Sequence, residues 1–170
     1  FMQKKLPLGI FDSGFGGLSV AKSIHNLLPN EELSYVADSA FTPYGDMEES
    51  DIVKRAILIS DFLINKKKSK VIVVACNTAT AYAVNTLRDR FNVPIIGMEP
   101  AVKPALKVTL NNKVGVLATS GTSKSAKFSA LLERYSGDVK FFVQPCPGLV
   151  NAIEKGSFDD EELFELLEKY

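Results

Sequence analysis

A cysteine, an asparagine and a threonine follow directly on a continuous apolar run. The run spans residues 71–75, and Cys76, Asn77 and Thr78 come at the point where a helical pattern begins. Main-chain amides and the dipole at the start of a helix favour anions, so we expect a thiolate at Cys76 to be stabilised there. Such a thiolate could act as a base or a nucleophile near neutral pH. Burial as a small apolar side chain is the alternative for Cys76, and helix capping is the alternative for Asn77 and Thr78.

A glycine-rich turn after the first predicted strand offers a second set of polar groups. Asp12 and Ser13 open this turn, and glycines at positions 14, 16 and 17 follow before a helical pattern starts. The amides of such a turn can hold a carboxylate or a phosphate, while Asp12 can face an ammonium or the thiol. A capped turn with a purely structural role is the alternative. The glycine spacing does not match a dinucleotide fingerprint and no lysine is placed as in a P-loop, so nucleotide binding is not favoured.

Three further sites carry reactive or polar side chains. Tyr44 and Gly45 follow a proline, and they form either an ordinary turn or a rim that closes over a ligand. His25 lies inside the first predicted helix, where we expect it to face solvent, because a cysteine–histidine pair would need it at the ligand edge of the sheet. Cys146 stands between two prolines in a loop, and we expect it to have a structural role.

The composition excludes several classes of function. The 20 Lys and Arg balance the 20 Asp and Glu, so no net field attracts nucleic acid or an anionic membrane. Apolar runs are far shorter than the roughly 20 residues that span a bilayer, and we see no secretory leader, so we expect a cytoplasmic protein. Cys76, Cys146 and the single histidine form neither a disulfide framework nor a metal site. The basic run at residues 66–68 is expected to be a solvated loop.

The elements that must position these side chains alternate between strand and helix. Continuous apolar runs predict strands, and apolar residues spaced by three and four predict helices. The predicted strands are residues 7–11, 33–36, 71–75 and 94–96, and the predicted helices are residues 17–28, 48–64 and 78–90. This alternation indicates a parallel sheet covered by helices. Every strand-to-helix turn then lies at one edge of the sheet, where α/β proteins place their ligands.

The sequence repeats its first strands at an offset of 106. Residues 9–14 resemble residues 115–121, and at the same offset residues 33–36 fall on residues 139–142, strand upon strand. The repeat predicts two similar α/β halves. The expected division is an N-terminal α/β domain at residues 1–98, which contains Cys76, and a partial second α/β domain at residues 99–170.

Short segments spread over nearly the whole chain form a more specific pattern. They are Gly9-Ile10-Phe11-Asp12-Ser13-Gly14 with Gly16-Gly17-Leu18, Pro43-Tyr44-Gly45, Ala75-Cys76-Asn77-Thr78-Ala79, Val114-Gly115-Val116-Leu117-Ala118-Thr119, Pro145-Cys146-Pro147 with Leu149-Val150, and Glu154-Lys155-Gly156. In their order and spacing these segments resemble the glutamate racemases, of the aspartate/glutamate racemase superfamily.

The resemblance implies an α/β fold of two pseudo-symmetric parallel-sheet domains with the active site between them. It implies an amino-acid racemase that interconverts L- and D-glutamate for peptidoglycan synthesis without a cofactor or metal, and dimers are usual for the family. Two cysteines of the family flank the substrate α-carbon. One takes the proton as a thiolate, and the other returns a proton to the opposite face. Thiols suit both roles because they titrate near the working pH.

By motif, the resemblance also assigns roles to residues of this chain. Cys76 is one acid/base residue, and Asp12 assists proton transfer and contacts the substrate together with Ser13. The residues expected to complete the near half of the substrate site are Tyr44, Gly45, Asn77 and Thr78, and those expected to line the other half are Thr119 and Thr122.

The second cysteine of the family lies in a Gly-Cys-Thr-His motif, which these 170 residues do not contain. The position equivalent to Cys76 by the internal offset, 76 + 106 = 182, lies beyond Tyr170. A final helix that Ser157 and Asp160 can cap also meets no Gly, Asn or Pro before Tyr170. We therefore expect a C-terminally truncated racemase that is inactive as it stands.

Two alternative functions remain open at this point. One is a racemase for aspartate or a related amino acid. The other belongs to a different class, a non-catalytic module that binds small anions through the turn at residues 12–17.

Overall fold

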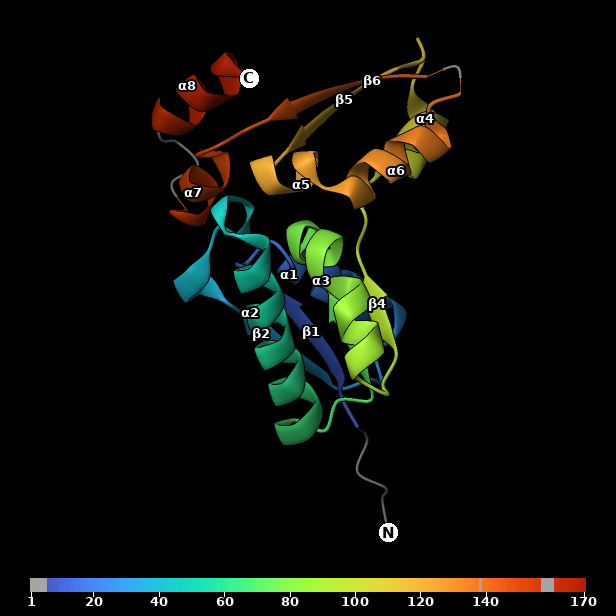
Figure 1. The fold of residues 1–170 in the computed structure, drawn as a ribbon, viewed down its shortest axis with the longest axis vertical. Helices are drawn as coiled ribbons and strands as arrows, with labels where there is room; N and C mark the ends of the chain where they lie inside the picture. Colours follow the sequence, from blue (N-terminus) through green and yellow to red (C-terminus); the bar gives the residue numbers. More distant parts are fainter. Residues whose placement is uncertain (1–5, 138, 157–160) are drawn as a thin grey trace. The chain divides into compact units, whose positions relative to one another are not determined.

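The computed structural model describes residues 6–137, 139–156 and 161–170 and divides the chain into two units, Phe1–Met98 and Glu99–Tyr170 (Figure 1). Each unit is built on a parallel sheet. The helix caps expected at Ser157 and Asp160 lie outside the described residues. The α/β class and the parallel sheets predicted from the sequence are confirmed.

The sheet of the first unit has four strands in the order β2-β1-β3-β4. The strands are β1 (Leu8–Asp12), β2 (Leu33–Ala37), β3 (Val71–Val74) and β4 (Ile95–Gly97). All pairs are parallel, and Phe11 of β1 is level with Val36 on one side and Val74 on the other. The residues that follow β1, β2 and β3 therefore emerge at the same edge of the sheet.

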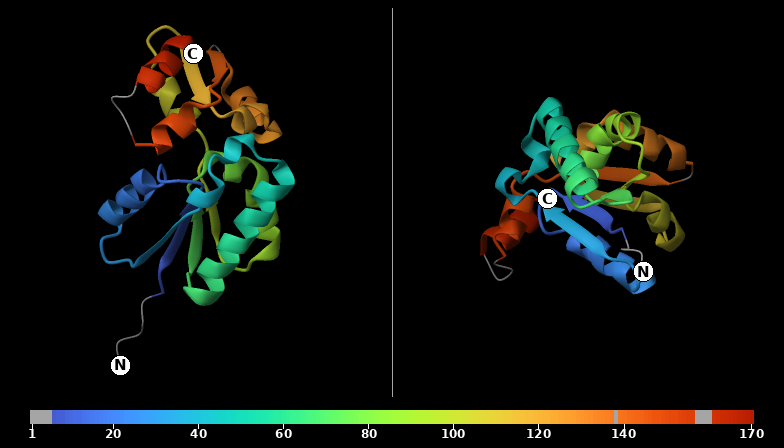
Figure 2. Two further views of the ribbon diagram at one scale, coloured as in Figure 1. Left: turned by 90° about the vertical axis from the view of Figure 1, so that its left-hand side faces the viewer. Right: turned by 90° about the horizontal axis from the view of Figure 1, so that it is seen from below.

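Helices cover both faces of this sheet. The helix α1 (Leu18–Leu27) covers one face, and α2 (Glu49–Asp61) and α3 (Asn77–Arg90) cover the other, as Figure 2 shows. Ile10 packs with the α1 side and Phe11 with the α2 and α3 side, so successive residues of β1 are both fully buried. Burial on both faces explains why the strands have continuous apolar sequences instead of an alternating pattern.

Two element boundaries of the first unit differ from the prediction. The helix expected at residues 48–64 ends as an α-helix at Asp61 and continues as a π-helical turn, η3 (Phe62–Lys66). Short 3₁₀ turns, η1 (Ser39–Phe41) and η2 (Tyr44–Asp46), occupy the connection between β2 and α2. These turns bring Tyr44 and Gly45 into the interior, where both are buried.

The second unit contains α4 (Val102–Val108), β5 (Lys113–Ala118), α5 (Ser120–Lys124), α6 (Ala126–Tyr135), β6 (Lys140–Pro145), α7 (Leu149–Glu154) and α8 (Glu161–Lys169). The strands β5 and β6 are parallel, and both lie where the internal repeat predicts them. The repeat is not exact, because Leu8 pairs with Leu33 (33 − 8 = 25) whereas Val114 pairs with Phe141 (141 − 114 = 27). An even difference of two residues keeps the same side chains on the same face of the sheet.

A small apolar core holds the second unit together. Phe128 and Leu131 of α6 are buried with Val102 of α4, against Val116 and Phe141 of the sheet. Along β5, and along β6 as far as Val143, the side chains alternate between half-buried and exposed, so the helices cover one face of this pair of strands. No helix among the described residues is long and apolar enough to cross a membrane.

Candidate functional site

Three of the predicted site residues meet at the carboxyl edge of the first sheet. Asp12 ends β1, Ser13 follows it, and Cys76 follows β3. The Cys76 Sγ donates to Ser13 Oγ across a distance of 3.5 Å. The Ala75 amide, which precedes Cys76, donates to the Phe11 carbonyl at 2.8 Å and fixes the two strand ends side by side. The prediction that the turns after the strands lie at one edge of the sheet is therefore confirmed.

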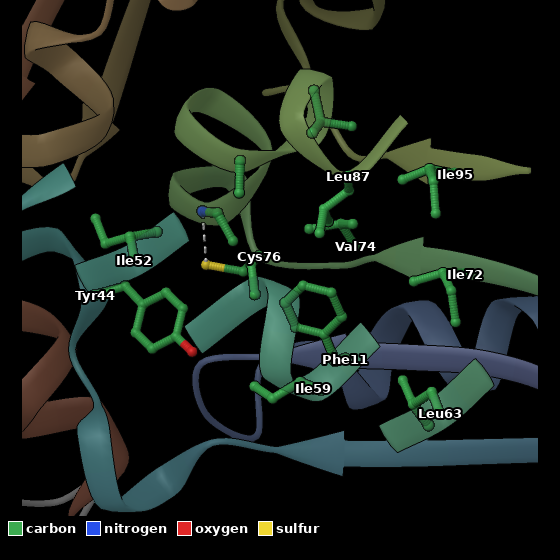
Figure 3. Packing of buried hydrophobic residues seen from close by; sticks show 14 residues of the cluster. Phe11, Tyr44, Ile52, Ile59, Leu63, Ile72, Val74, Cys76, Leu87 and Ile95 are labelled. Carbon is green, nitrogen blue, oxygen red and sulfur yellow. Dashed lines mark hydrogen bonds between the residues drawn. The ribbon is translucent and has the colours of Figure 1, made fainter. Parts of the chain in front are cut away.

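Cys76 is the N-cap residue of α3. Its main chain is extended, and its sulfur accepts a hydrogen bond from the Ala79 amide at 3.3 Å (Figure 3). The side chain is buried with 6% exposure, in the same apolar cluster as Phe11 and Tyr44. Cys76 thus combines the two roles that the sequence left open, since it is both a buried apolar residue and a thiol aimed at a helix start.

The pKa of the Cys76 thiol differs from the expectation. Burial raises this pKa above its ordinary value, and the negative charge of Asp12 raises it further. Hydrogen bonds from the Ala79 amide and from Ser13 lower it, but their effect is smaller. The prediction of a stabilised thiolate was therefore wrong for the unliganded chain, because the cost of removing the charge from water exceeds the gain from the helix start.

Asp12 is buried and is held by the first turn of α1. Its Oδ2 accepts a hydrogen bond from the Gly17 amide at 2.9 Å. A side chain at Gly17 would collide with its surroundings, because an added Cβ would lie 2.7 Å from Asp12 Cβ and 2.9 Å from Ala75 Cβ. Gly17 is therefore what permits the helix to start so close to the strand ends.

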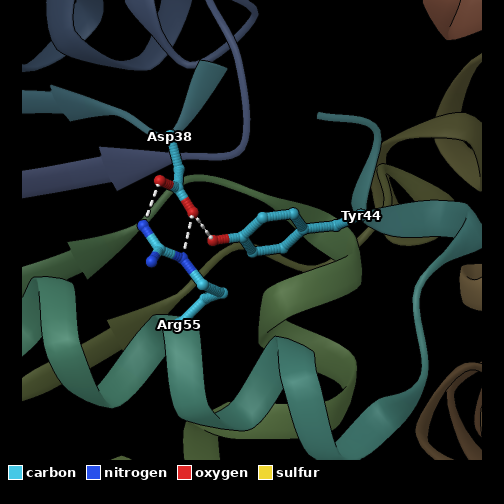
Figure 4. A network of polar contacts seen from close by, with 3 residues as sticks. All are labelled: Asp38, Tyr44 and Arg55. Atoms are coloured by element: carbon cyan, nitrogen blue, oxygen red, sulfur yellow. Dashed lines mark hydrogen bonds and ion pairs between the residues drawn. The ribbon is translucent and has the colours of Figure 1, made fainter. Parts of the chain in front are cut away.

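Tyr44 does not present its hydroxyl as a free group. The phenol donates to Asp38 Oδ2 at 2.5 Å, and Arg55 of α2 donates to both oxygens of the same carboxylate (Figure 4). Burial raises the pKa of Tyr44, and the hydrogen bond to Asp38 raises it further. Because the hydroxyl is engaged with Asp38, the groups of this segment that remain for a ligand are the main-chain groups of Tyr44 and Gly45.

Asp38 and Arg55 were missed by the sequence reasoning. Asp38 follows β2 at the same edge as Asp12 and Cys76, and its amide donates to the Asp12 carbonyl at 3.0 Å. An acidic residue directly after a predicted strand was a usable signal for Asp38. Arg55 lies in the middle of a helix, and no local pattern separates it from a surface arginine.

The remaining predicted residues lie in two places. Asn77 is exposed and Thr78 is buried, both in the first turn of α3. Thr119 caps α5 in the second unit, where its Oγ1 accepts from the Thr122 amide at 3.1 Å, and Thr122 is buried. Thr119 stands 106 residues after Ser13 (119 − 13 = 106), so it follows β5 as Ser13 follows β1.

The structure also describes the groups to which the sequence analysis assigned no catalytic role. His25 is exposed on α1, as predicted. The run at residues 66–68 is exposed as predicted, but Lys66 is the last residue of η3 and not part of a loop. Cys146 is buried and its sulfur donates to the Gln144 carbonyl at 3.3 Å. Within the described part of the chain, no group of three or more His, Cys, Asp or Glu is placed to hold a metal ion.

The sequence pattern of the Asp/Glu/Hydantoin racemase family matches residues 9–169. The chain belongs to this family. The resemblance seen in the sequence is thereby confirmed. The glutamate racemase of Ectopseudomonas mendocina is 53% identical over 169 residues, which are 99% of this chain and 64% of the relative. The glutamate racemase of Pseudomonas aeruginosa PAO1 is 53% identical over 163 residues, 95% of this chain and 61% of the relative.

Solved racemase structures share the fold. Escherichia coli glutamate racemase, solved in complex with L-glutamate and the activator UDP-MurNAc-Ala, is 35% identical with a TM-score of 0.86, over 96% of this chain and 64% of that chain. Francisella tularensis glutamate racemase, solved in complex with D-glutamate, is 31% identical with a TM-score of 0.80, over 98% of this chain and 62% of that chain. The chain thus spans less than two thirds of the length of these racemases.

Proposed function

We propose that this protein is a cofactor-independent glutamate racemase in which Cys76 is one of two acid/base groups. The observation that carries the proposal is the placement of the Cys76 thiol at a helix start, 3.5 Å from Ser13 Oγ and under the charge of the buried Asp12. The similarity to glutamate racemases at 53% identity supports glutamate as the substrate. The role in peptidoglycan synthesis and the cytoplasmic location are part of the same proposal.

In the proposed mechanism, the substrate itself activates the thiol. Burial and the negative charge of Asp12 together keep Cys76 protonated. The carboxylate of Asp12 attracts the ammonium group of glutamate, and the ammonium offsets the part of this effect that comes from the charge of Asp12. The Ala79 amide and the Ser13 hydroxyl then stabilise the thiolate. The Sγ takes the proton from Cα of one enantiomer, and the electron pair of that bond passes into the α-carboxylate as an enediolate.

Inversion also needs a proton donor on the opposite side of Cα. Cys146 is buried against its own loop, and we propose no catalytic role for it. The 170 residues are therefore proposed to exchange the α-proton of one enantiomer slowly and not to racemise it. We propose that the near half of the substrate site consists of Ser13, Tyr44, Gly45, Asn77 and Thr78, and that Thr119 and Thr122 belong to the other half.

Incubation of the chain with each enantiomer of glutamate in deuterated water tests this function. We expect deuterium at Cα of one enantiomer, no optical inversion, and loss of the exchange in Cys76→Ala. The matched control is Cys146→Ala, which should keep the exchange. Racemisation at an enzymatic rate by the 170 residues, or exchange that survives Cys76→Ala, would contradict the proposal.

The family description also covers aspartate and hydantoins, so the same exchange assay with aspartate decides substrate preference. Faster exchange with the shorter side chain would favour an aspartate racemase. Homodimer formation stays a prediction from the resemblance, and sedimentation equilibrium of the purified chain tests it.

A further inference from the structure

We infer that Asp38 and Arg55 are positioning residues, which hold Tyr44 and, through it, the main chain of Gly45 beside Cys76. Only the test with glutamate as the substrate rests on the proposed function. The structural part concerns the unliganded chain, and it can be tested without any activity.

The carboxylate of Asp38 joins three elements of the first unit. Asp38 follows β2, Tyr44 lies in η2, and Arg55 lies in α2. Tyr44 donates to Oδ2 at 2.5 Å, and Arg55 donates from Nε to Oδ2 at 2.8 Å and from Nη2 to Oδ1 at 2.5 Å. Two-pronged pairing of this kind fixes direction as well as distance, which a single lysine contact would not.

The side chains of Asp38 and Tyr44 are buried, so loss of their hydrogen bonds would leave polar groups without partners in the interior. Asp38 is 7% exposed and Tyr44 is 1% exposed. A buried carboxylate is costly unless its oxygens are paired, and here Arg55 and Tyr44 together pair them. The guanidinium carbon of Arg55 also lies over the ring of Phe41, 3.8 Å from its centroid. Each partner therefore has one well-defined position.

The position of Tyr44 matters because its segment contacts the helix that Cys76 caps. The turn η2 contacts α3, and Tyr44 belongs to the same buried cluster as Cys76. The Met47 amide donates to the Tyr44 carbonyl at 3.2 Å and closes the turn around Gly45. The phenol remains protonated, since burial and Asp38 raise its pKa, so Tyr44 acts by position and not by proton transfer.

Hydrogen exchange of single amides tests the structural part. We expect the Met47 amide to exchange about tenfold faster in Tyr44→Phe, which removes the buried hydrogen bond to Asp38, and in Asp38→Asn, which removes the negative charge that pairs with Arg55. The Ala75 amide, in the strand ladder, should keep its rate. Lys54→Gln is the matched control, because it breaks the exposed pair of Lys54 with Asp51 on the same helix.

Two results would overturn the inference. One is an unchanged Met47 amide in both Tyr44→Phe and Asp38→Asn. The other is equal acceleration of Met47 and Ala75, because this would show that the network serves global stability only. Tyr44→Phe keeps the ring and its packing, so this variant decides the question even where Asp38→Asn does not fold.

The α-proton exchange assay supplies the functional readout. If the Gly45 main chain holds the substrate, Tyr44→Phe and Arg55→Met should each raise the KM for glutamate about tenfold and change the maximal rate less than about threefold. The KM of Arg55→Lys should lie between that of Arg55→Met and that of the unsubstituted chain. A fall in the maximal rate alone would overturn the assigned role. Absence of exchange in the unsubstituted chain would instead contradict the proposed function, and the Met47 amide would still decide the positioning.

Discussion

The Cys76 thiol is under two opposing influences. Its place at the start of α3 gives it the Ala79 amide as a donor, whereas burial and the charge of Asp12 oppose its ionisation. In the unliganded chain the second influence is larger, so the thiol is protonated near neutral pH. A resting thiol is also less exposed to oxidation and alkylation than a resting thiolate would be.

Removing the charge of Asp12 should make Cys76 easier to ionise. The pH profile of Cys76 alkylation in the unsubstituted chain should have its midpoint above 9.0, the ordinary pKa, and Asp12→Asn should lower this midpoint. Asparagine keeps an oxygen that can accept from the Gly17 amide, so the helix start is retained. Mass spectrometry of the separate peptides identifies the modified cysteine. A midpoint in Asp12→Asn equal to or above that of the unsubstituted chain would contradict this account.

Among the elements, α1 begins very close to the ends of the strands. Gly17, directly before α1, leaves no room for a Cβ between Asp12 and Ala75. Its backbone is in the right-handed helical region, so alanine would suffer there from lack of space and not from backbone strain. The start of α1 can therefore lie this close to the sheet only because residue 17 has no Cβ.

Gly17→Ala should therefore destabilise the protein by about 1–3 kcal/mol, as overpacking of a filled interior does. Urea unfolding followed by circular dichroism measures the change. Gly16→Ala is the matched control, because its Cβ would meet only Asp12 Oδ2 at an ordinary contact distance of 3.6 Å. We expect that variant to differ from the unsubstituted chain by less than about 0.5 kcal/mol. Equal losses in the two variants would show that the close approach is not the cause.

At the scale of the whole molecule, two parallel-sheet units repeat one strand–helix–strand plan. The buried carboxylates of the first unit, Asp12 and Asp38, lie at the carboxyl ends of β1 and β2, and Cys76 and Tyr44 are buried as well. Burial raises the pKa of Cys76 and that of Tyr44. The stability of the folded chain is therefore coupled to pH in the alkaline range.

Both groups hold their protons more tightly when the chain is folded, so their contribution to stability is complete at lower pH. The contribution of Cys76 falls as the pH rises above 9.0, the ordinary pKa of the thiol, and the contribution of Tyr44 falls above 10.0, the ordinary pKa of the phenol. Each group lowers the unfolding free energy by up to about 1.4 kcal/mol per pH unit in this range. Urea unfolding from pH 7 to 10.5 should show the fall. The double variant Cys76→Ala, Tyr44→Phe should show a shallower slope, and an identical slope would contradict the assignment.

The sequence by itself determined the strands and the main helices of the first unit and the position of Cys76 after β3. Strands and helices are encoded in local spacing of apolar residues, so the turn after β3 and the cysteine in it could be predicted without a structure. The offset of 106 likewise located β5 and β6, because similar strands have similar local sequences. The predicted parallel sheet placed the turns after β1 and β3 at one edge, whereas the contact of Ser13 with Cys76 also depends on the strand order, which puts β1 beside β3.

Only the tertiary structure decided how these groups behave. The raised pKa of Cys76 depends on burial by residues distant in sequence, and the role of Tyr44 depends on Asp38 and Arg55, which lie 6 and 11 positions away (44 − 38 = 6 and 55 − 44 = 11) on other elements. The need for glycine at position 17 arises from contact with Asp12 and Ala75. Local patterns encode backbone conformation, whereas solvent exclusion and charge neighbours arise when separate elements pack together.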